Sequence, residues 1–332
     1  MSAGPARVLD ALRSAAGRPL TGVALSESHG VSRTQIWKDV ETLRARGYQI
    51  DAEPGGGYRL VAAPDRLYPE ELRRGLETRW MACEIHHLDE TDSTNRVALE
   101  LARDGAPHGA TVVAEGQTAG RGRLGRSFYS PPYLNLYSST ILRPALDITQ
   151  APAWILASAV AVAEAISETL EAPDAVEIKW PNDVLVNGRK SSGILMELGA
   201  EATRIAFLVL GIGVNLNVDP GDFPTEFRAT ATSLAAERGA PIDRAAFART
   251  LYGWLEKVLD ACAVEGFRGI LPRFEARFRM RGREVGVREQ DGKEHRGRVH
   301  GIDTDGALLL ELAGGSVARF VAGDVTVAKE TA

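Results

Sequence analysis

The chain has 332 residues, which is long enough for two or three domains and at least one full hydrophobic core. Apolar residues make up 44% and charged residues 25% of the sequence, an ordinary globular composition that argues against a disordered or fibrous protein. Lys and Arg number 39 against 44 Asp and Glu, and this net charge of −5 excludes a wholly basic nucleic-acid coat but not a local basic face. Two cysteines exclude a disulfide framework or a CxxC metal site and fit the reducing cytoplasm, where we expect the protein.

No segment is expected to direct secretion or to span a membrane. The first fifteen residues lack a long apolar core and a cleavage signal. The longest apolar run, residues 153–166, is rich in Ala and contains Ser158 and Glu164, so it is too short and too weakly hydrophobic to cross a bilayer. This run predicts a buried helix instead.

Residues 1–62 predict a winged helix-turn-helix. Val8 and Leu12 belong to the apolar stripe of a first helix. Thr21 and Ser32 are typical caps of two further helices. The segments on either side of PGGG alternate apolar and polar residues, which is typical of a β-hairpin.

Three further parts follow in the chain. Residues 63–84 are interrupted by prolines and predict a linker with one short helix from Pro69. Residues 85–275 mix strand-like and helical patterns and predict an α/β or α+β domain. Residues 276–332 contain five short strand-like runs between DG, DTDG and GG turns, which predicts a small β-barrel. The predicted fold class is therefore multidomain α+β.

The third predicted helix carries candidate DNA contacts, because the first turns of this helix in a helix-turn-helix enter the major groove. Residues 32–46 hold four basic and two acidic side chains, a local charge of +2 that would attract phosphates. We predict DNA binding, weak unless the module dimerises. The alternative is a helical cap used only for packing or regulation. The candidate contacts are Ser32, Arg33, Thr34, Gln35, Trp37 and Lys38.

The segment GRGRLG, residues 120–125, matches the GxGxxG pattern of dinucleotide-binding loops. Such a loop lies between a strand and a helix, but the following RSFYSPPY cannot open a helix. We therefore reject the Rossmann interpretation. The chain also has no GxxxxGKS or GxxxxGKT sequence, which excludes a P-loop NTPase.

The wider segment QTAGRGRLGR, residues 117–126, indicates an anion site. Arg121, Arg123 and Arg126 carry guanidinium groups that match phosphate and carboxylate geometry. Three glycines between them let the backbone approach a ligand closely. A solvated charged loop is the alternative, but alternating Gly and Arg beside a Gln favours the anion site.

Three other segments hold candidate ligand contacts. KWPNDVLVNGRK, residues 179–190, predicts a strand and a β-hairpin with Lys190 near its turn, although such a lysine is commonly solvated. TDSTN, residues 91–95, precedes a helical pattern and serves either as an N-cap or as a set of contacts to a polar ligand. GIGVNLN, residues 211–217, is either a Gly-rich strand end or a place where the backbone approaches a nucleotide.

In this order and at these spacings, TDSTN, QTAGRGRLGR, KWPNDVLVNGRKSSGILMEL and GIGVNLN resemble the biotin–protein ligase family. The N-terminal segments VSRTQIWKDVETLRARGYQI and GGGYRL resemble its bifunctional bacterial members, which also repress the biotin operon. The resemblance covers nearly the whole chain. It implies a central domain with a mixed sheet, like those of class II synthetases and biotin ligases, and a C-terminal SH3-like β-barrel.

The resemblance also implies the reaction: biotin and ATP form biotinyl-5′-adenylate and pyrophosphate, and the biotinyl group then passes to one lysine of a biotin carboxyl carrier protein. The implied biotin-binding residues are Ser93, Thr94, Asn95, Gln117, Arg121, Gly122, Arg123 and Lys190. The implied contacts to ATP and the adenylate are Gly120, Arg121, Arg123, Phe128, Asn182, Lys190 and Asn215. Phe128 stands where some members place a tryptophan against the adenine, but an aromatic face for stacking is kept.

The chemistry of the first step agrees with these roles. Attack of a carboxylate on an ATP phosphate brings two anions together, so fixed cations must offset the repulsion. Lys190, Arg121 and Arg123 supply them, with Mg²⁺ expected on the phosphates and no metal site expected in the protein. A Gly-Arg loop that orders over the ligand would shield the reactive anhydride from water. Asp183, in the turn near Lys190, is either an assistant in deprotonating the carrier lysine or a turn-forming residue.

The resemblance implies regulation as well. Biotinyl-5′-adenylate would favour a homodimer that reads two half-sites of the biotin operator, since loops ordered by the ligand form an interface at lower entropic cost. Three alternatives stay open: a ligase whose winged helix does not bind DNA, a ligand sensor without catalysis, and a lipoate ligase. The KWPND and GRGRLGR clusters weigh against the sensor, and TDSTN with GRGRLGR favours biotin.

Overall fold

The computed structural model describes residues 1, 3–53, 56–201, 204–289 and 291–327. The chain divides into two compact units, Met1–Arg66 and Leu67–Ala332. The four-part division at residues 62, 84 and 275 stays a prediction.

The first unit has the predicted three helices and hairpin. The elements are α1 (Ala3–Ser14), α2 (Gly22–His29), α3 (Arg33–Ala45), β1 (Gln49–Glu53) and β2 (Gly57–Ala62). The predicted caps are confirmed, because the Thr21 and Ser32 side chains accept hydrogen bonds from the backbone N–H groups of Ala24 and Gln35. The hairpin strands pair antiparallel, while the start of the predicted PGGG turn, residues 54–55, lies outside the described residues.

The second unit is built on a seven-stranded sheet in the order β3-β4-β5-β9-β8-β7-β6. The strands are β3 (Ile85–Leu88), β4 (Thr111–Ala114), β5 (Leu136–Leu142), β6 (Val176–Lys179), β7 (Asp183–Val186), β8 (Arg189–Glu201) and β9 (Arg204–Val214). The pair β3–β4 is parallel and the other neighbours are antiparallel, so the sheet is mixed, as the resemblance implied.

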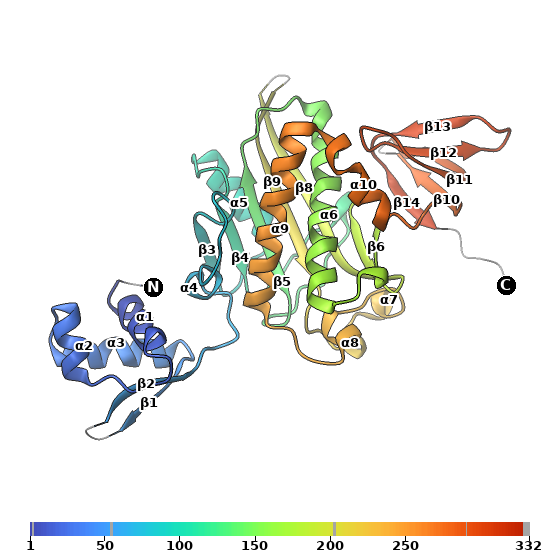
Figure 1. Cartoon of the computed structure of the whole chain (residues 1–332). Helices are drawn as coiled ribbons and strands as arrows, with labels where there is room; N and C mark the ends of the chain where they lie inside the picture. Colours follow the sequence, from blue (N-terminus) through green and yellow to red (C-terminus); the bar gives the residue numbers. More distant parts are fainter. Residues whose placement is uncertain (2, 54–55, 202–203, 290, 328–332) are drawn as a thin grey trace. The chain divides into compact units, whose positions relative to one another are not determined.

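Helices cover both faces of this sheet. Figure 1 shows α6 (Ala151–Leu170) and α9 (Arg244–Glu265) side by side over one face. The helix α5 (Thr94–Arg103) packs against the opposite face, as the alternation of strand side chains shows: Val113 and Leu210 belong to the α6–α9 core, whereas Val112 and Val209 belong to the α5 cluster.

The helix α6 confirms the predicted buried helix. Residues Ile148–Leu170 are long and apolar enough to cross a membrane, but 67% of their apolar stretch is buried inside the protein. It is therefore the core helix of a folded domain. Two shorter helices pack against it, α8 (Leu234–Arg238) and α10 (Phe267–Arg277). Two others lie elsewhere in the unit, α4 (Pro69–Leu72) and α7 (Thr225–Arg228).

The C-terminal part is a five-stranded antiparallel sheet in the order β13-β12-β11-β10-β14. Its strands are β10 (Glu284–Arg288), β11 (Glu294–Ile302), β12 (Leu308–Leu312), β13 (Val317–Phe320) and β14 (Asp324–Val327). All five strand-like runs of the sequence are thereby confirmed, although the expected last residue of the fifth, Ala328, lies outside the described residues. The Trp180 indole N–H donates to the Gly306 carbonyl at 3.1 Å and joins this sheet to the central one.

Candidate functional site

A cavity of about 580 Å³ in the second unit is lined by residues of all four sequence motifs. This volume lies within the usual range of small-molecule sites. The predicted residues in its wall are Ser93, Thr94, Asn95, Gln117, Arg121, Gly122, Arg123, Phe128, Asn182, Asp183 and Lys190. Residues 121–123 and residue 190, which are far apart in sequence, therefore share one cavity.

The TDSTN segment and the start of the Gly-Arg loop lie side by side. Thr91 and Gln117 form an isolated parallel bridge, and the Thr118 N–H donates to the Thr91 carbonyl at 2.9 Å. The Gln117 Oε1 atom accepts hydrogen bonds from the Thr94 backbone N–H at 2.9 Å and from its hydroxyl at 3.1 Å. This corner of the cavity is thus held in place before any ligand binds.

The N-cap interpretation of TDSTN does not describe the Ser93 side chain. Ser93 occupies the N-cap position of α5, but no hydrogen bond from its side chain to the helix is found in the described part of the chain. The neighbouring Asp92 side chain binds the backbone just before the helix instead, because its Oδ1 accepts a hydrogen bond from the Ser93 backbone N–H at 2.7 Å. Ser93 lines the cavity, and no hydrogen bond of its hydroxyl is found among the described residues.

The basic side of the cavity is formed by the β7–β8 hairpin. The pairing of β7 with β8 has a register shift beside Lys190, and such bulges change the direction of side chains next to active sites. The Lys190 Nζ lies 2.7 Å from Asp183 Oδ1, while 38% of the Lys190 side chain is exposed. The lysine is therefore paired at one side and open to the cavity at the other.

The Gly-Arg loop crosses the cavity and is tied at two points. Arg123 Nη1 donates to Asn182 Oδ1 at 3.2 Å, and Arg126 Nη1 donates to Asp324 Oδ1 at 3.2 Å. Burial lowers the pKa of Arg123, and the charges of Asp324 and Asp183 oppose this change. The loop forms only a short 3-10 turn, η1 (Arg123–Gly125), and not the long helix of a dinucleotide-binding motif. This turn agrees with our rejection of the Rossmann interpretation.

Two glycines of GIGVNLN make room for side chains that line the cavity. A Cβ atom on Gly211 would come within 2.0 Å of Asn95 Oδ1, and one on Gly213 within 2.5 Å of the Phe128 ring. The glycines therefore permit close packing of side chains. Whether a nucleotide also approaches them stays a prediction.

Two predicted ligand contacts do not line the cavity. Gly120 packs closely on its own loop, where a Cβ would lie 2.4 Å from Ser130 Oγ. Asn215 is 5% exposed and its Nδ2 donates to the Thr232 carbonyl at 3.1 Å. Their roles toward ATP stay predictions that need a movement or an indirect contact.

Several residues of the wall lie outside the four sequence motifs. Asp324 comes from the C-terminal sheet, and Tyr137, Glu226 and Phe227 come from segments without a motif. The spacing along the chain carries no signal for them, because only the fold brings these segments to the cavity.

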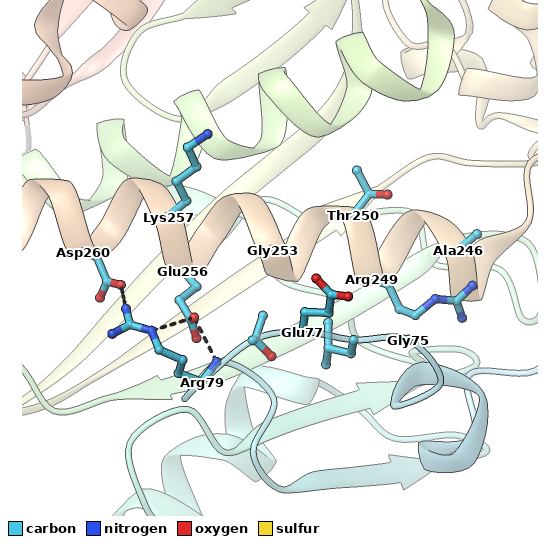
Figure 2. Close-up of a pocket in the computed structure, with 12 residues that line it drawn as sticks. Gly75, Glu77, Arg79, Ala246, Arg249, Thr250, Gly253, Glu256, Lys257 and Asp260 are labelled. Atoms are coloured by element: carbon cyan, nitrogen blue, oxygen red, sulfur yellow. Dashed lines mark hydrogen bonds and ion pairs between the residues drawn. The ribbon is translucent and has the colours of Figure 1, made fainter.

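A second, open hollow of about 700 Å³ lies between residues 75–79 and α9 (Figure 2). The Glu256 carboxylate accepts from the backbone N–H groups of Arg79, Trp80 and Met81 at 2.8–3.0 Å, and Arg79 also pairs with Asp260. These charges fasten one segment to a helix, which indicates a structural role for this hollow.

All six predicted DNA contacts of the first unit are exposed. Arg33, Thr34 and Trp37 line a hollow of about 780 Å³ between α3 and the hairpin, and the Trp37 side chain is 53% exposed. Two candidates also have local partners: Ser32 caps α3, and Gln35 Nε2 donates to Asp39 Oδ1 at 2.9 Å. Lys38 is exposed on the same helix. Base contacts by these side chains stay a prediction.

Among the described residues, no group of three or more His, Cys, Asp or Glu could hold a metal ion. Three carboxylates, Asp183, Glu226 and Asp324, line the cavity. Asp183 and Asp324 are each paired with a basic side chain.

Comparison with known families identifies the three parts of the chain. Residues 88–215 match the Biotin/lipoate A/B protein ligase family, residues 6–59 match an HTH domain, and residues 282–327 match the Biotin protein ligase C terminal domain. In structure, the chain is similar to the biotin protein ligase from Aquifex aeolicus in complex with biotin and ATP, with a TM-score of 0.64 and 28% identity, over 74% of this chain and 99% of that one.

Curated relatives extend the match over both units. The bifunctional ligase/repressor BirA of Escherichia coli (strain K12) is 32% identical over 92% of each chain. That of Bacillus subtilis (strain 168) is 40% identical over 88% of this chain and 89% of the relative. The chain therefore belongs to the biotin protein ligase family, among the bifunctional ligase/repressor members with an N-terminal HTH domain.

Proposed function

We propose that the protein activates biotin with ATP and transfers it to one lysine of a biotin carboxyl carrier protein. The observation that carries this proposal is the single cavity that unites Arg123 and Lys190 with the polar residues 93–95. Its basic side fits an acyl phosphate, and its polar corner fits the ring of biotin.

In the first step, a biotin carboxylate oxygen attacks the α-phosphorus of ATP, the bond to the β-phosphate breaks, and pyrophosphate leaves. Lys190, Arg121 and Arg123 offset the negative charge that develops at the phosphorus. In the second step, the carrier amine attacks the acyl carbon, the bond to AMP breaks and an amide forms. The amine must lose a proton, and the Asp183 carboxylate is our candidate acceptor because it lies at the reacting end of Lys190.

Mg²⁺ would be held mainly by the ATP phosphates and water, because this ion keeps several of its waters and binds substrate phosphates. The ion supplies further positive charge to the phosphates. The oxygen donors in the wall, Asp183 and Glu226 among them, suit such a hard cation.

The N-terminal unit supports the proposal that the protein also represses biotin genes. Both curated relatives named above are ligase/repressors, and the exposed first turns of α3 carry Arg33 and Lys38. We propose that biotinyl-5′-adenylate promotes a homodimer that binds operator DNA, and that the protein works in the cytoplasm. We further propose an SH3-like barrel for the C-terminal sheet.

Incubation with biotin, Mg-ATP and a carrier domain, read by mass spectrometry, tests the ligase proposal. We expect a biotin-sized mass increase on one carrier lysine, and no transfer when lipoate replaces biotin. Transfer of lipoate alone, or no transfer at all, would contradict it. A gel shift on the organism's own biotin promoter, with and without biotin and ATP, tests repression separately.

A further inference from the structure

Behind the polar corner of the cavity lies a carboxylate that the proposed reaction does not use. Asn95 lines the cavity, and its Nδ2 donates to Glu197 Oε2 at 2.8 Å and to the Leu195 carbonyl at 3.3 Å. Glu197 and Leu195 lie on β8. Because an amide nitrogen has two N–H groups, both are used by these acceptors, and Asn95 Oδ1 faces the other way.

Ser139, on β5, extends this arrangement. Its fully buried hydroxyl lies 2.6 Å from Asn95 Oδ1 and 2.7 Å from Thr94 Oγ1, and donates to them. A hydroxyl has one proton, so it serves only one of these two oxygens at a time. The other oxygen keeps its lone pairs for a different donor.

The proton of the Thr94 hydroxyl is also used in a hydrogen bond within the protein. The Thr94 hydroxyl donates to Gln117 Oε1 at 3.1 Å. The cavity-lining Thr94 and Asn95 therefore offer lone pairs to a ligand, and the Ser93 hydroxyl beside them can donate. A group with N–H donors next to a carbonyl oxygen, such as a cyclic urea, complements this surface.

We infer that Glu197 is a positioning residue that fixes which end of the Asn95 amide faces the ligand. A carboxylate only accepts hydrogen bonds, whereas the two ends of an amide have nearly the same shape. Glu197 Oε2 and the Leu195 carbonyl are the two acceptors at the Nδ2 end of the amide. If the Asn95 amide flipped, its Oδ1 would face these two acceptors. Its N–H groups would then face the N–H groups of the ligand. Gly211 keeps space at the correct end, because a Cβ there would come within 2.0 Å of Asn95 Oδ1.

This inference rests on the proposed function, which names the ligand as biotin with its ureido ring. The test is Glu197→Gln, which keeps the size of the side chain but adds N–H donors and so permits the flipped amide. We expect about tenfold weaker biotin binding by calorimetry without ATP, the factor of one lost hydrogen bond. The KM for biotin should rise by a similar factor, while the KM for ATP and the Tm stay near the wild-type values.

Two controls separate positioning from a general effect. Glu100→Gln makes the same charge change at an exposed position of α5, and we expect unchanged biotin binding. In an Asn95→Ala background, Glu197→Gln should have no further effect, because it acts through an amide that is no longer present.

Wild-type affinity in Glu197→Gln would overturn the inference, and so would a parallel loss of ATP binding or an equal loss in the Asn95→Ala background. A wild-type protein that does not bind biotin would instead overturn the proposed function. The two failures are therefore distinguishable.

Discussion

Glu115 and Arg244 pair inside the second unit with no exposed side-chain surface, whereas Lys190 and Arg126 line the cavity with 38% and 63% of their side chains exposed. In the buried group, Arg244 Nη1 lies 3.0 Å from Glu115 Oε2, and His87 Nε2 lies 3.0 Å from Glu115 Oε1. The Leu67 N–H donates to the same carboxylate at 2.9 Å.

The difference teaches how one domain uses charge for two purposes. Each buried charge is surrounded by protein partners and has no room for a ligand, so its role is to join Leu67, α9 and the end of β4. The cavity cations keep one side open, and an arriving anion can replace water there at little cost to the fold.

Arg244→Met should give the largest effect, because it removes one partner of the buried Glu115–Arg244 pair. Removing one partner leaves Glu115 charged and buried, and we expect a loss of about 3–5 kcal/mol in the free energy of unfolding. Urea denaturation measures it. Lys190→Met is the matched control, for which we expect a change below about 0.5 kcal/mol because the lysine is partly solvated. Equal losses in the two variants would contradict the comparison.

Lys190→Ala should show the opposite pattern. We expect adenylate formation to fall about 10²–10³-fold, the usual effect of removing a group that stabilises charge in the transition state. Pyrophosphate release in single-turnover experiments measures the rate, and thermal unfolding should give a nearly unchanged Tm. Normal adenylation would remove Lys190 from its assigned role.

Acid should lower the stability that Glu115 and its buried partners give to the fold. Burial alone would raise the pKa of Glu115, but the hydrogen bond from His87 and the charge of Arg244 outweigh burial and lower it to about 2. The folded state therefore binds the proton less tightly than the unfolded chain, and this stabilisation, on the order of 3 kcal/mol, is lost as the pH falls from about 4.5 toward 2. Unfolding free energies across this range should fall less steeply in Arg244→Met than in the wild type; equal slopes would contradict the assignment.

Arg123→Gly should have the smallest effect of these variants on free energy. It should still change which lysines receive biotin. The loop loses its hydrogen bond to Asn182, so the adenylate should escape several-fold faster. Mass spectrometry of bystander proteins should then find biotin on unintended lysines. Release at the wild-type rate would refute the shielding role of the loop.

Much of the fold could be predicted because its signals are local. Caps such as Thr21 and Ser32 and the alternation along the strands act within a few residues. The strand β3 was missed because its IHHL sequence is short and contains two histidines. The helix α10 was missed because Pro272 interrupts its pattern.

The residues of the site also divide into those with a local sequence signal and those without one. Motifs that line the cavity, such as residues 93–95 and Lys190, are compact in sequence and could be found. Glu197 and Ser139 could not, because each lies within a strand and gains its partner only through the pairing of β8 and β5 with β9. Asp324 is 198 residues away from Arg126, and no local pattern connects them.

The contact between Arg126 and Asp324 joins the C-terminal sheet to the wall of the cavity in the central domain. A chain truncated before β14 would retain all four motifs of the cavity yet lose the Asp324 contact that anchors the Gly-Arg loop. On the proposed function, shortened or fused versions of the protein should therefore keep this last strand, because Asp324 lies in it.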